Sequence, residues 1–371
     1  MRSRPTVAVD LRAVVREPTG IGIYTTELLR ALGGRDNFAL LGLAHRPPSN
    51  LAELADYGVR VEHQPAPLGV LWQQLRLPRR LARGDIDLFW SPLFTLPLRT
   101  PVPAVVTVHD MTAFLFPEAH HWKVRWSLKP FLRPSLRRAR RIVTPSRSAA
   151  DDLAAFDPAS SERLRVVPEG VDAAFRPASP AQVAAIRREL GAPEGYLFAA
   201  GTLEPRKNLG ALLDAWQRLR HENPDCPPLV IAGGYGWGSR DLVARLERLR
   251  DEGVFLLGRV SRQRLIELFQ AATVFVYPSL YEGFGLPPLE AMACAVPVVV
   301  ANRSSLPEVV GDAGRRFDPD DGDGLYRALG ELLAAPEAAT ALGRAGLERS
   351  RGFTWEKAAQ AMEEIFREAL E

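Results

Sequence analysis

Cysteine and long apolar runs are both scarce in this sequence, and each shortage excludes a class of protein. Cys226 and Cys294 are the only cysteines in 371 residues, so neither a disulfide framework nor the paired spacing of a zinc site is present. No apolar run reaches the length of a membrane-spanning helix, and the opening MRSRPTVAVDL lacks the apolar core of a signal peptide. The sequence therefore predicts a cytoplasmic protein.

Charge is distributed unevenly along the chain, although the net charge is only +3. Residues 1–176 contain 25 Lys and Arg against 17 Asp and Glu, whereas the remainder contains 22 against 27. The length is sufficient for two domains, each with its own core. We expect the basic first half to be the one that meets an anionic partner, such as a membrane surface.

The stretch 273–300 combines two apolar runs with a glycine turn between them. The runs Val274–Tyr277 and Val296–Val300 predict buried strands. The turn Glu282–Gly285 contains two glycines, which adopt backbone angles that other residues resist. The two prolines that follow suit the first turn of a helix, because they lack the N–H group that would be unpaired there. Free N–H groups at such a turn make an anion site.

Two carboxylates, Glu282 and Glu290, flank this anion site with seven residues between them. We predict Glu290 in the first turn of the helix, where its oxygens can accept hydrogen bonds from a diol. Glu282 precedes the helix and could orient sugar hydroxyls. An anion site beside hydroxyl-binding groups indicates a sugar nucleotide. The alternative is that Glu290 only caps its helix and that Glu282 is a solvated charge in the turn.

A second glycine turn follows the predicted strand Tyr196–Ala200. It runs from Gly201 to Asn208, and Asn208 is predicted to cap the next helix. Arg206 and Lys207 lie in this turn, the position expected of diphosphate ligands at the carboxyl end of a strand. A solvated basic turn is the alternative.

The first half also alternates strands with helices, which predicts a doubly wound parallel sheet. The predicted strands are Thr6–Leu11, Phe38–Leu43, Arg60–Glu62, Ile86–Trp90, Ala104–Val108, Ile142–Pro145 and Arg165–Pro168. A loop with Gly20 and Gly22 precedes a helix that we predict from about Ile23 to Leu32. A dinucleotide fingerprint would have a third glycine at Thr25 and would begin at the end of the strand, which argues against a nicotinamide-dependent dehydrogenase.

Two further features of the first half have both structural and functional interpretations. His109 follows a predicted strand, where it could line a site or merely pack in the core. Residues 122–141 contain eight Lys or Arg and no acid, with Trp122 and Trp126 interleaved. Pro130 and Pro134 predict two short helices there rather than one. This stretch is either a solvated basic face or a patch for anionic lipid headgroups.

The motif YPSLYEGFGLPPLEAMACAVPVV resembles that of glycosyltransferase family 4, and the similarity extends over nearly the whole chain. Ala295 stands where members often have glycine. The resemblance implies the α/β GT-B fold, with two doubly wound, Rossmann-like domains facing a deep cleft. We expect an acceptor-side domain at 1–175, a donor-binding domain at 176–353, and a last helix at 354–371 that crosses back to the first domain.

The resemblance also implies roles for individual residues. The residues that match the family's catalytic positions are His109, Arg206, Lys207 and Glu282. The implied donor-binding residues are Gly20, Gly22, Gly201, Val260, Gly283, Phe284, Gly285, Leu286 and Glu290. Gly20 and Gly22 could instead be simple turn glycines. No resident cofactor is expected, because the nucleotide sugar is a co-substrate. No obligatory metal is expected either, because Arg206 and Lys207 are available for the diphosphate.

The implied activity is retaining transfer of a hexose from a nucleotide sugar to a hydroxyl of a glycan or lipid-linked acceptor. GDP-mannose is the expected donor, because the sequence resembles bacterial mannosyltransferases of surface polysaccharide synthesis, with UDP-glucose as the alternative. Peripheral contact with an anionic membrane at its inner face is expected, and nucleic acid is not. A non-catalytic sugar-nucleotide-binding module on the same fold is the remaining rival.

Overall fold

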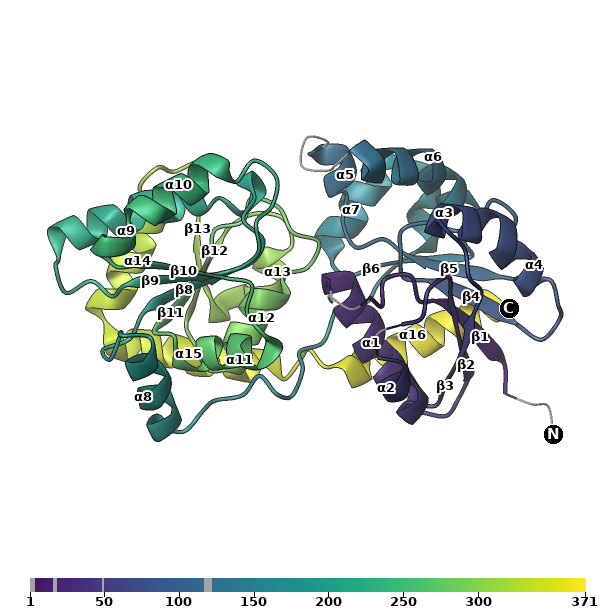
Figure 1. Cartoon of the computed structure of the whole chain (residues 1–371), viewed down its shortest axis with the longest axis horizontal. Coiled ribbons are helices and arrows are strands. Elements are labelled where there is room, and N and C mark those ends of the chain that lie inside the picture. Colours follow the sequence, from purple (N-terminus) through teal and green to yellow (C-terminus); the bar gives the residue numbers. More distant parts are fainter. Residues whose placement is uncertain (1–3, 16–18, 49, 117–121) are drawn as a thin grey trace. The chain divides into compact units, whose positions relative to one another are not determined.

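The computed structural model describes residues 4–15, 19–48, 50–116 and 122–371, and only the backbone of 122–127. The chain divides into two compact units, shown in Figure 1. Unit 1 consists of Met1–Gly170 and Thr354–Glu371, and unit 2 of Val171–Phe353. Within the described ranges, no helix has both the length and the apolar character needed to cross a membrane.

Unit 1 contains a seven-stranded parallel sheet in the order β3-β2-β1-β4-β5-β6-β7. Its strands are β1 (Thr6–Asp10), β2 (Ala39–Ala44), β3 (Val59–His63), β4 (Leu88–Ser91), β5 (Ala104–Thr107), β6 (Arg141–Thr144) and β7 (Leu164–Val166). The helical segments are α1 (Gly20–Gly33), α2 (Leu51–Asp56), α3 (Gly69–Leu71), the π-helix η1 (Trp72–Arg76), α4 (Leu77–Leu81), α5 (Thr112–Leu115), α6 (Trp122–Arg138), α7 (Arg147–Phe156) and η3 (Pro158–Arg163).

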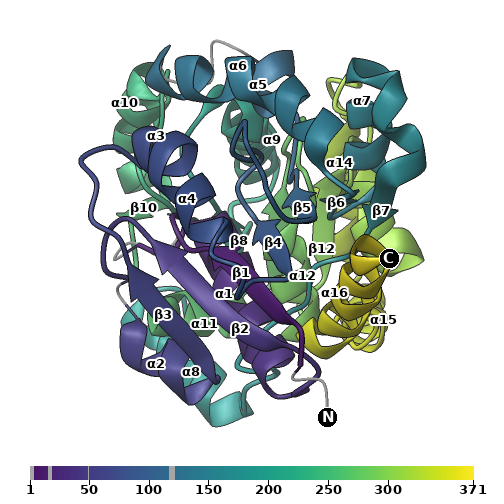
Figure 2. The same cartoon turned by 90° about the vertical axis from the view of Figure 1, so that its right-hand side faces the viewer.

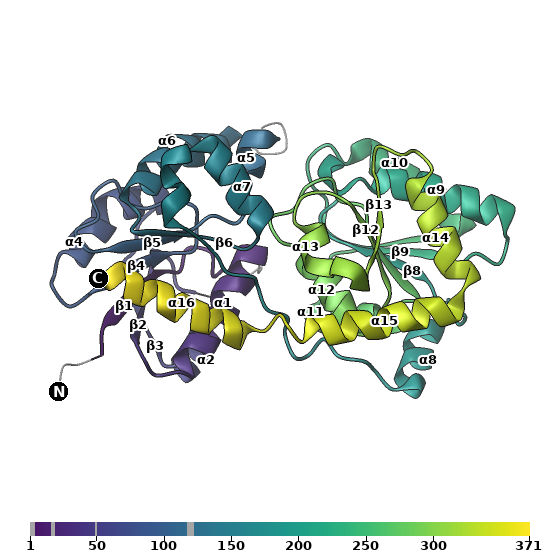
Figure 3. The ribbon, with the colours of Figure 1, turned by 180° about the vertical axis from the view of Figure 1, so that it is seen from behind.

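Alternation along the strands gives unit 1 two cores, one on each face of the sheet. In β1, Val7 and Val9 pack with α1 and with the last helix, α16 (Trp355–Leu370). Ala8 instead packs on the opposite face, where Trp72 and α6 lie. Figure 2 shows α16 and α4 on opposite sides of the sheet, and Figure 3 shows α16 alongside α1. The sheet is therefore covered on both faces, as a parallel sheet requires.

The middle of α16 is held to the rest of unit 1 by a buried carboxylate. Glu363 accepts hydrogen bonds from Asn37 at 2.9 Å and pairs with Arg35 at 3.0 Å. Trp355 and Phe366 on the same helix are almost completely buried in the core of unit 1. Burial of a large aromatic side chain stabilises by about 2–3 kcal/mol, so these two side chains fix the helix to this unit.

Unit 2 repeats the architecture with a six-stranded parallel sheet in the order β10-β9-β8-β11-β12-β13. Its strands are β8 (Leu197–Ala200), β9 (Leu229–Ala232), β10 (Val254–Gly258), β11 (Val274–Tyr277), β12 (Val298–Ala301) and β13 (Arg315–Phe317). The helical segments are α8 (Pro180–Glu189), η4 (Pro205–Lys207), α9 (Leu209–Glu222), α10 (Arg240–Arg248), η5 (Arg250–Glu252), α11 (Arg262–Ala271), α12 (Leu286–Ala293), α13 (Leu306–Val310), η6 (Gly311–Ala313), α14 (Gly324–Ala334) and α15 (Pro336–Ser350). The predicted fold of two doubly wound parallel sheets is confirmed.

The prediction of two short helices in the basic stretch is wrong, because α6 runs through both prolines as one helix. Pro130 and Pro134 are four residues apart and so lie on the same side of the helix. Pro130 is exposed and Pro134 half-buried, so water can reach the carbonyls that lose their N–H partners. The helix can then bend rather than end. The side chains of Trp122 and Trp126 lie outside the described residues.

Candidate active site

The candidate site in unit 2 lies where the strand order of its sheet reverses. Strands β8 and β11 are neighbours there, although three helices and two strands separate them in sequence. Ligands of doubly wound sheets bind at the carboxyl ends of the strands at such a switch point. The turn after β8 carries Arg206 and Lys207, and the turn after β11 carries Glu282. The fold therefore brings these three residues together.

Arg206, Lys207 and Glu282 form one largely buried cluster, with side chains 16%, 11% and 12% exposed. Lys207 Nζ donates to Glu282 Oε1 at 2.6 Å and to the Tyr277 hydroxyl at 2.6 Å. Arg206 Nη1 lies 3.2 Å from the same Glu282 oxygen, which also accepts from Ser279 Oγ at 2.5 Å. Charge-assisted hydrogen bonds of this length are strong and directional. The two cations are thus held in fixed positions at the switch point.

Burial and charge act in opposite directions on this cluster. Burial alone would raise the pKa of Glu282, but Lys207 and Arg206 outweigh it and lower that pKa to about 2. Burial lowers the pKa of Lys207 from its ordinary value, and the Glu282 carboxylate partly offsets this effect. Burial, followed by the charge of Glu282, raises the pKa of Tyr277 well above its usual range. At neutral pH, Glu282 is therefore a carboxylate.

Arg206 has a second acidic partner, Glu204, with which it forms an ion pair. Its guanidinium also donates to the Tyr281 carbonyl. The backbone around it is fixed by η4 and by Asn208, whose φ of 53° is left-handed. Asn208 is the N-cap of α9 as predicted, but its side chain makes no capping hydrogen bond. Asn208 is suited to this turn because asparagine adopts the left-handed conformation more readily than most residues.

Two serines hold the start of the turn from Gly283 to Leu286 through the backbone of Glu282. Ser304 accepts a hydrogen bond from the Glu282 N–H at 3.1 Å, and the Ser305 hydroxyl donates to the Glu282 carbonyl at 2.9 Å. Gly285 has a φ of 120°, which favours glycine, and Phe284 is buried beside it. The backbone of the turn that leads into α12 is therefore rigidly placed.

The structure places Glu290 one turn later than predicted. Helix α12 begins at Leu286, and no acid lies in its first turn. The prolines occupy the first turn, as expected, but the helix starts before them. Glu290 is half-buried in the second turn, near Cys294, whose pKa is raised by burial and then by the Glu290 charge. Any favourable effect of the helix dipole on Glu290 is correspondingly weaker.

Two other predicted donor residues lie at the same edge of the sheet. Gly201 directly follows β8 and has a φ of 137°. A Cβ added at Gly201 would lie 3.5 Å from the Lys207 side chain, and one added at Gly233, after β9, would lie 1.8 Å from the Gly201 carbonyl oxygen. Val260 follows β10, two strands away from β8. Gly201 is therefore adjacent to the cation cluster, whereas Val260 follows the outermost strand of the sheet.

The remaining predicted residues belong to unit 1. Gly20 and Gly22 lie in the first turn of α1, which begins at Gly20 with Thr19 as its N-cap, and not in a preceding loop. A Cβ added at Gly22 would lie 2.7 Å from the Ala13 carbonyl oxygen, whereas one at Gly20 would meet no described atom within 4 Å. Gly22 is therefore required by packing, and Gly20 leaves the helix N-terminus open. Pro18 of the predicted loop lies outside the described residues.

His109 follows β5 and is 7% exposed. Its Nε2 lies 2.9 Å from the Pro92 carbonyl oxygen, and its Nδ1 lies 3.7 Å from Glu169 Oε1. Tyr24 packs against the ring edge-on, at a centroid distance of 4.7 Å. Both ring nitrogens thus face groups of unit 1, and the imidazole orientation is fixed by them.

Four residues of these clusters were not predicted from the sequence, namely Tyr277, Ser279, Glu204 and Glu169. Tyr277 and Ser279 lie inside the recognised motif, so their proximity to Glu282 in sequence could have indicated them. Glu204 likewise precedes Arg206 by two residues. Glu169 could not have been found in this way, because it is distant from His109 in sequence and joins it only through the fold.

The acidic turn at residues 318–323 contains several aspartates, the kind of side chain that could hold a metal ion. Its carboxylates are instead paired with arginines: Asp320 with Arg303, Asp321 with Arg327 and Asp323 with Arg218. Among the residues that the structure describes, no three His, Cys, Asp or Glu side chains group as a possible metal site.

Two doubly wound units, with cations and a glycine turn at a switch point, define the class of GT-B glycosyltransferases. The chain belongs to glycosyltransferase family 4. Residues 18–175 match the family model "Glycosyltransferase Family 4", and residues 183–349 match "Glycosyl transferases group 1". The protein is therefore a glycosyltransferase.

Curated relatives include two mannosyltransferases of Escherichia coli. O-antigen chain mannosyltransferase B is 36% identical over 364 residues, which cover 91% of this chain and 93% of that one. Serotype-specific mannosyltransferase WbdA is 30% identical over 239 residues, covering 63% of this chain but only 29% of WbdA. Among solved structures, Anabaena Alr3699/HepE in complex with UDP-glucose superposes with a TM-score of 0.76 at 20% identity, over 98% of this chain and 99% of that one.

Proposed function

We propose that this protein transfers mannose, with retention of configuration, from GDP-mannose to a hydroxyl of a glycan or lipid-linked acceptor. The observation that carries the proposal is the largely buried Arg206–Lys207–Glu282 cluster beside the glycine turn Gly283–Leu286 that leads into α12. It provides hydrogen-bond donors where a diphosphate would be bound. The names of the two Escherichia coli relatives support mannose as the sugar.

The cluster is suited to stabilising a leaving diphosphate. As the bond between the sugar C1 and the phosphate oxygen breaks, negative charge accumulates on the diphosphate. Arg206 and Lys207 can donate hydrogen bonds to it without rearrangement, because Glu204 and Glu282 already hold them. In the proposed front-face displacement, the acceptor oxygen bonds to C1 on the same side, and its proton passes to the departing phosphate oxygen.

A donor panel tests the proposed specificity. The full chain would be incubated with GDP-mannose, UDP-glucose and other nucleotide sugars, and binding followed by thermal shift. A donor at one hundred times its Kd stabilises by about 2.7 kcal/mol. We expect GDP-mannose to give the largest shift and to release GDP in the presence of a mannose-containing acceptor. A larger shift and turnover with UDP-glucose would overturn the assignment of the donor, and binding without turnover would indicate a non-catalytic module.

We further propose that turnover needs no divalent metal, because Arg206 and Lys207 can provide the charge stabilisation that a metal would otherwise supply. The expected result is that EDTA leaves the rate of GDP release unchanged. The same assay with added Mg²⁺ or Mn²⁺ is the control. Loss of activity in EDTA, with recovery on adding either metal, would contradict this proposal.

Replacement of Glu290 by alanine should weaken donor binding more than turnover. The proposed contact between Glu290 and the donor diol persists in the ground state and the transition state alike, so its loss raises KM for the donor and leaves kcat nearly unchanged. Steady-state kinetics with varied GDP-mannose measure both constants. Glu247→Ala, which removes an exposed carboxylate from α10 in the same unit, is the matched control. A fall in kcat with an unaltered KM would assign Glu290 to the chemical step instead.

We also propose that the protein acts in the cytoplasm, in peripheral contact with the inner face of an anionic membrane. The excess of basic residues in the first half of the chain supports this proposal. A lipid-linked acceptor would be within reach of an enzyme held there.

A further inference from the structure

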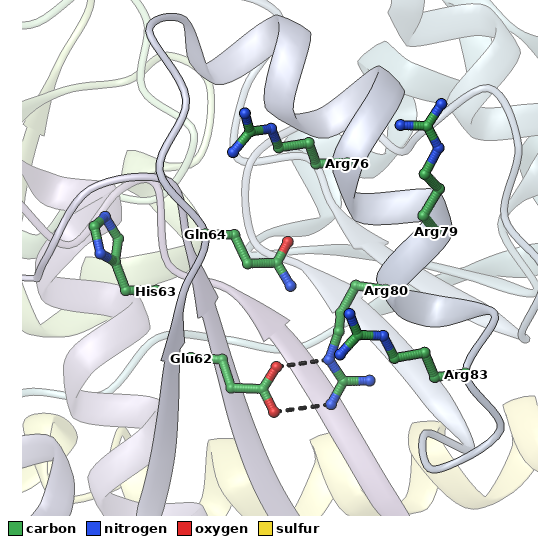
Figure 4. A pocket seen from close by; sticks show the side chains of 7 residues that line it. All are labelled: Glu62, His63, Gln64, Arg76, Arg79, Arg80 and Arg83. Atoms are coloured by element: carbon green, nitrogen blue, oxygen red, sulfur yellow. Dashed lines mark hydrogen bonds and ion pairs between the residues drawn. The ribbon is translucent and has the colours of Figure 1, made fainter.

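Arginine side chains gather around a surface pocket of unit 1 whose lining contains none of the predicted site residues. The pocket has a volume of about 470 Å³ and lies between the end of β3 and the helical segment formed by η1 and α4. Figure 4 shows the seven side chains that line it: Glu62, His63, Gln64, Arg76, Arg79, Arg80 and Arg83. Four of the seven are arginines, and only one is an acid.

The single acid in the pocket is already neutralised. Arg80 is buried and makes two hydrogen bonds to Glu62, at 2.6 and 2.9 Å, and two to Asp85, at 2.6 and 2.8 Å. Arg80 is therefore part of the scaffold. The charge that faces solvent comes from Arg76, Arg79 and Arg83, which are all exposed. Within the described part of the chain, these three arginines form no ion pair, although Arg76 donates to the Pro65 carbonyl.

A row of exposed leucines leads into this group of arginines along the same segment. Leu68, Leu71 and Leu75 are 60%, 45% and 57% exposed. The π-helical turn explains why Leu75 faces outward. In such a turn, residues five apart are stacked, and Leu77 N–H bonds to the Trp72 carbonyl, so that Trp72 and Leu77 both point into the core. Leu75, which lies between them, is left at the surface. Leu68 and Leu71 precede Trp72 and are exposed as well.

The segment is firmly attached beneath this surface. Trp72, Leu77 and Leu81 are almost completely buried. Gln73 is buried as well, and its amide donates to the Thr95 carbonyl at 2.8 Å. The leucines and arginines are therefore presented by a fixed element rather than by a loose loop.

Apolar side chains and unpaired cations on one exposed helical segment match an anionic lipid surface, with leucines among the acyl chains and arginines at the phosphates. We propose that residues 68–83 dock the protein on a membrane rich in anionic phospholipid. This inference rests on the proposed peripheral location and assigns it to this segment instead of the basic stretch 122–141.

The basic stretch 122–141 is a poorer candidate, because several of its described cations serve the fold. Lys129 lies over the Phe114 ring, and Arg133 lies over the Phe156 ring, at 5.7 and 4.6 Å. Arg138 donates to the Leu98 and Pro134 carbonyls, and Arg141 pairs with Glu368 at 2.6 Å. These contacts compete with lipid phosphates for the same groups.

The test compares two triple variants that lose the same charge. Arg76→Gln/Arg79→Gln/Arg83→Gln alters the proposed surface, and Lys129→Gln/Arg133→Gln/Arg137→Gln alters α6. The full chain would be sedimented with vesicles of phosphatidylcholine containing about 30% phosphatidylglycerol, which supplies the anionic surface that attracts basic segments. Each arginine near such a surface contributes about 1 kcal/mol, so we expect the first variant to bind at least tenfold more weakly and the second to bind like the wild type. A third variant, Leu68→Ser/Leu71→Ser/Leu75→Ser, should also bind more weakly.

Several outcomes would overturn the inference. Equal losses in the two charge variants would show that only net charge matters. Normal binding by the leucine variant, together with release from vesicles by millimolar pyrophosphate, would make the pocket a site for a soluble anion. GDP release from GDP-mannose, measured without vesicles, separates this inference from the proposed function. A wild-type protein that turns over but ignores the vesicles refutes only the docking surface, and one that binds vesicles but is inert towards every nucleotide sugar refutes only the function.

Discussion

Replacing Lys207 by alanine is expected to lower turnover a hundredfold or more. Lys207 is held at 2.6 Å from both Glu282 and Tyr277, so its ammonium group is positioned before the diphosphate leaves. Removal of one preorganised donor to a developing negative charge typically lowers kcat by about a hundredfold to a thousandfold. The loss should appear in kcat rather than in KM, because the charge develops mainly in the transition state. Initial rates of GDP release measure it.

The Lys207 variant can be distinguished from a misfolded one. Arg206 lies 3.2 Å from Glu282 in the wild-type chain, so the carboxylate should keep a cationic partner when Lys207 is truncated. The variant should therefore still fold and bind GDP, which calorimetry can establish. Lys129→Ala removes an exposed cation from α6 and is the matched control. A Lys207→Ala protein that turns over within a few-fold of the wild type would refute the assigned role.

Strand positions were the most predictable part of the fold, because a buried strand of a parallel sheet is a short apolar run that needs no knowledge of distant residues. The runs ending at Ala200 and Tyr277 are strands with those same ends in the structure. The cations and the carboxylate of the site were predictable too, since each lies in a turn directly after such a run. Their meeting at a switch point then follows from the order of the strands.

The errors came from rules applied to one residue at a time. Proline usually ends a helix, but the spacing of Pro130 and Pro134 allows α6 to continue. Glycines usually mark a loop, but Thr19 caps α1 and places Gly22 inside it, beside the Ala13 carbonyl. In each case the deciding contact involves a second residue whose position the local sequence does not specify. The partner of His109, Glu169, was hidden for the same reason.

Replacing Glu282 by glutamine is expected to destabilise the protein by about 3 kcal/mol at neutral pH. The pKa of Glu282 is lowered from 4.5 to about 2 in the folded protein, and each pKa unit corresponds to about 1.4 kcal/mol. The side chain is only 12% exposed, so solvent screens little of this energy. Glutamine has the same shape but leaves Lys207 and Arg206 adjacent without a neutralising charge, and breaking a buried pair in this way is strongly destabilising.

The pH dependence gives the sharper form of this last prediction. A carboxylate with a lowered pKa binds fewer protons when folded than when unfolded, so its stabilisation is complete above the unfolded pKa of about 4.5 and is lost as the pH falls towards 2. The difference in urea midpoint between the wild type and Glu282→Gln should therefore be constant from pH 7 to about 5.5, and fall to about half at pH 3. Glu247→Gln, which removes an exposed carboxylate from unit 2, should show no such decline. A difference that stays constant down to pH 3 would contradict this prediction, because the destabilisation would then not depend on the ionisation of Glu282.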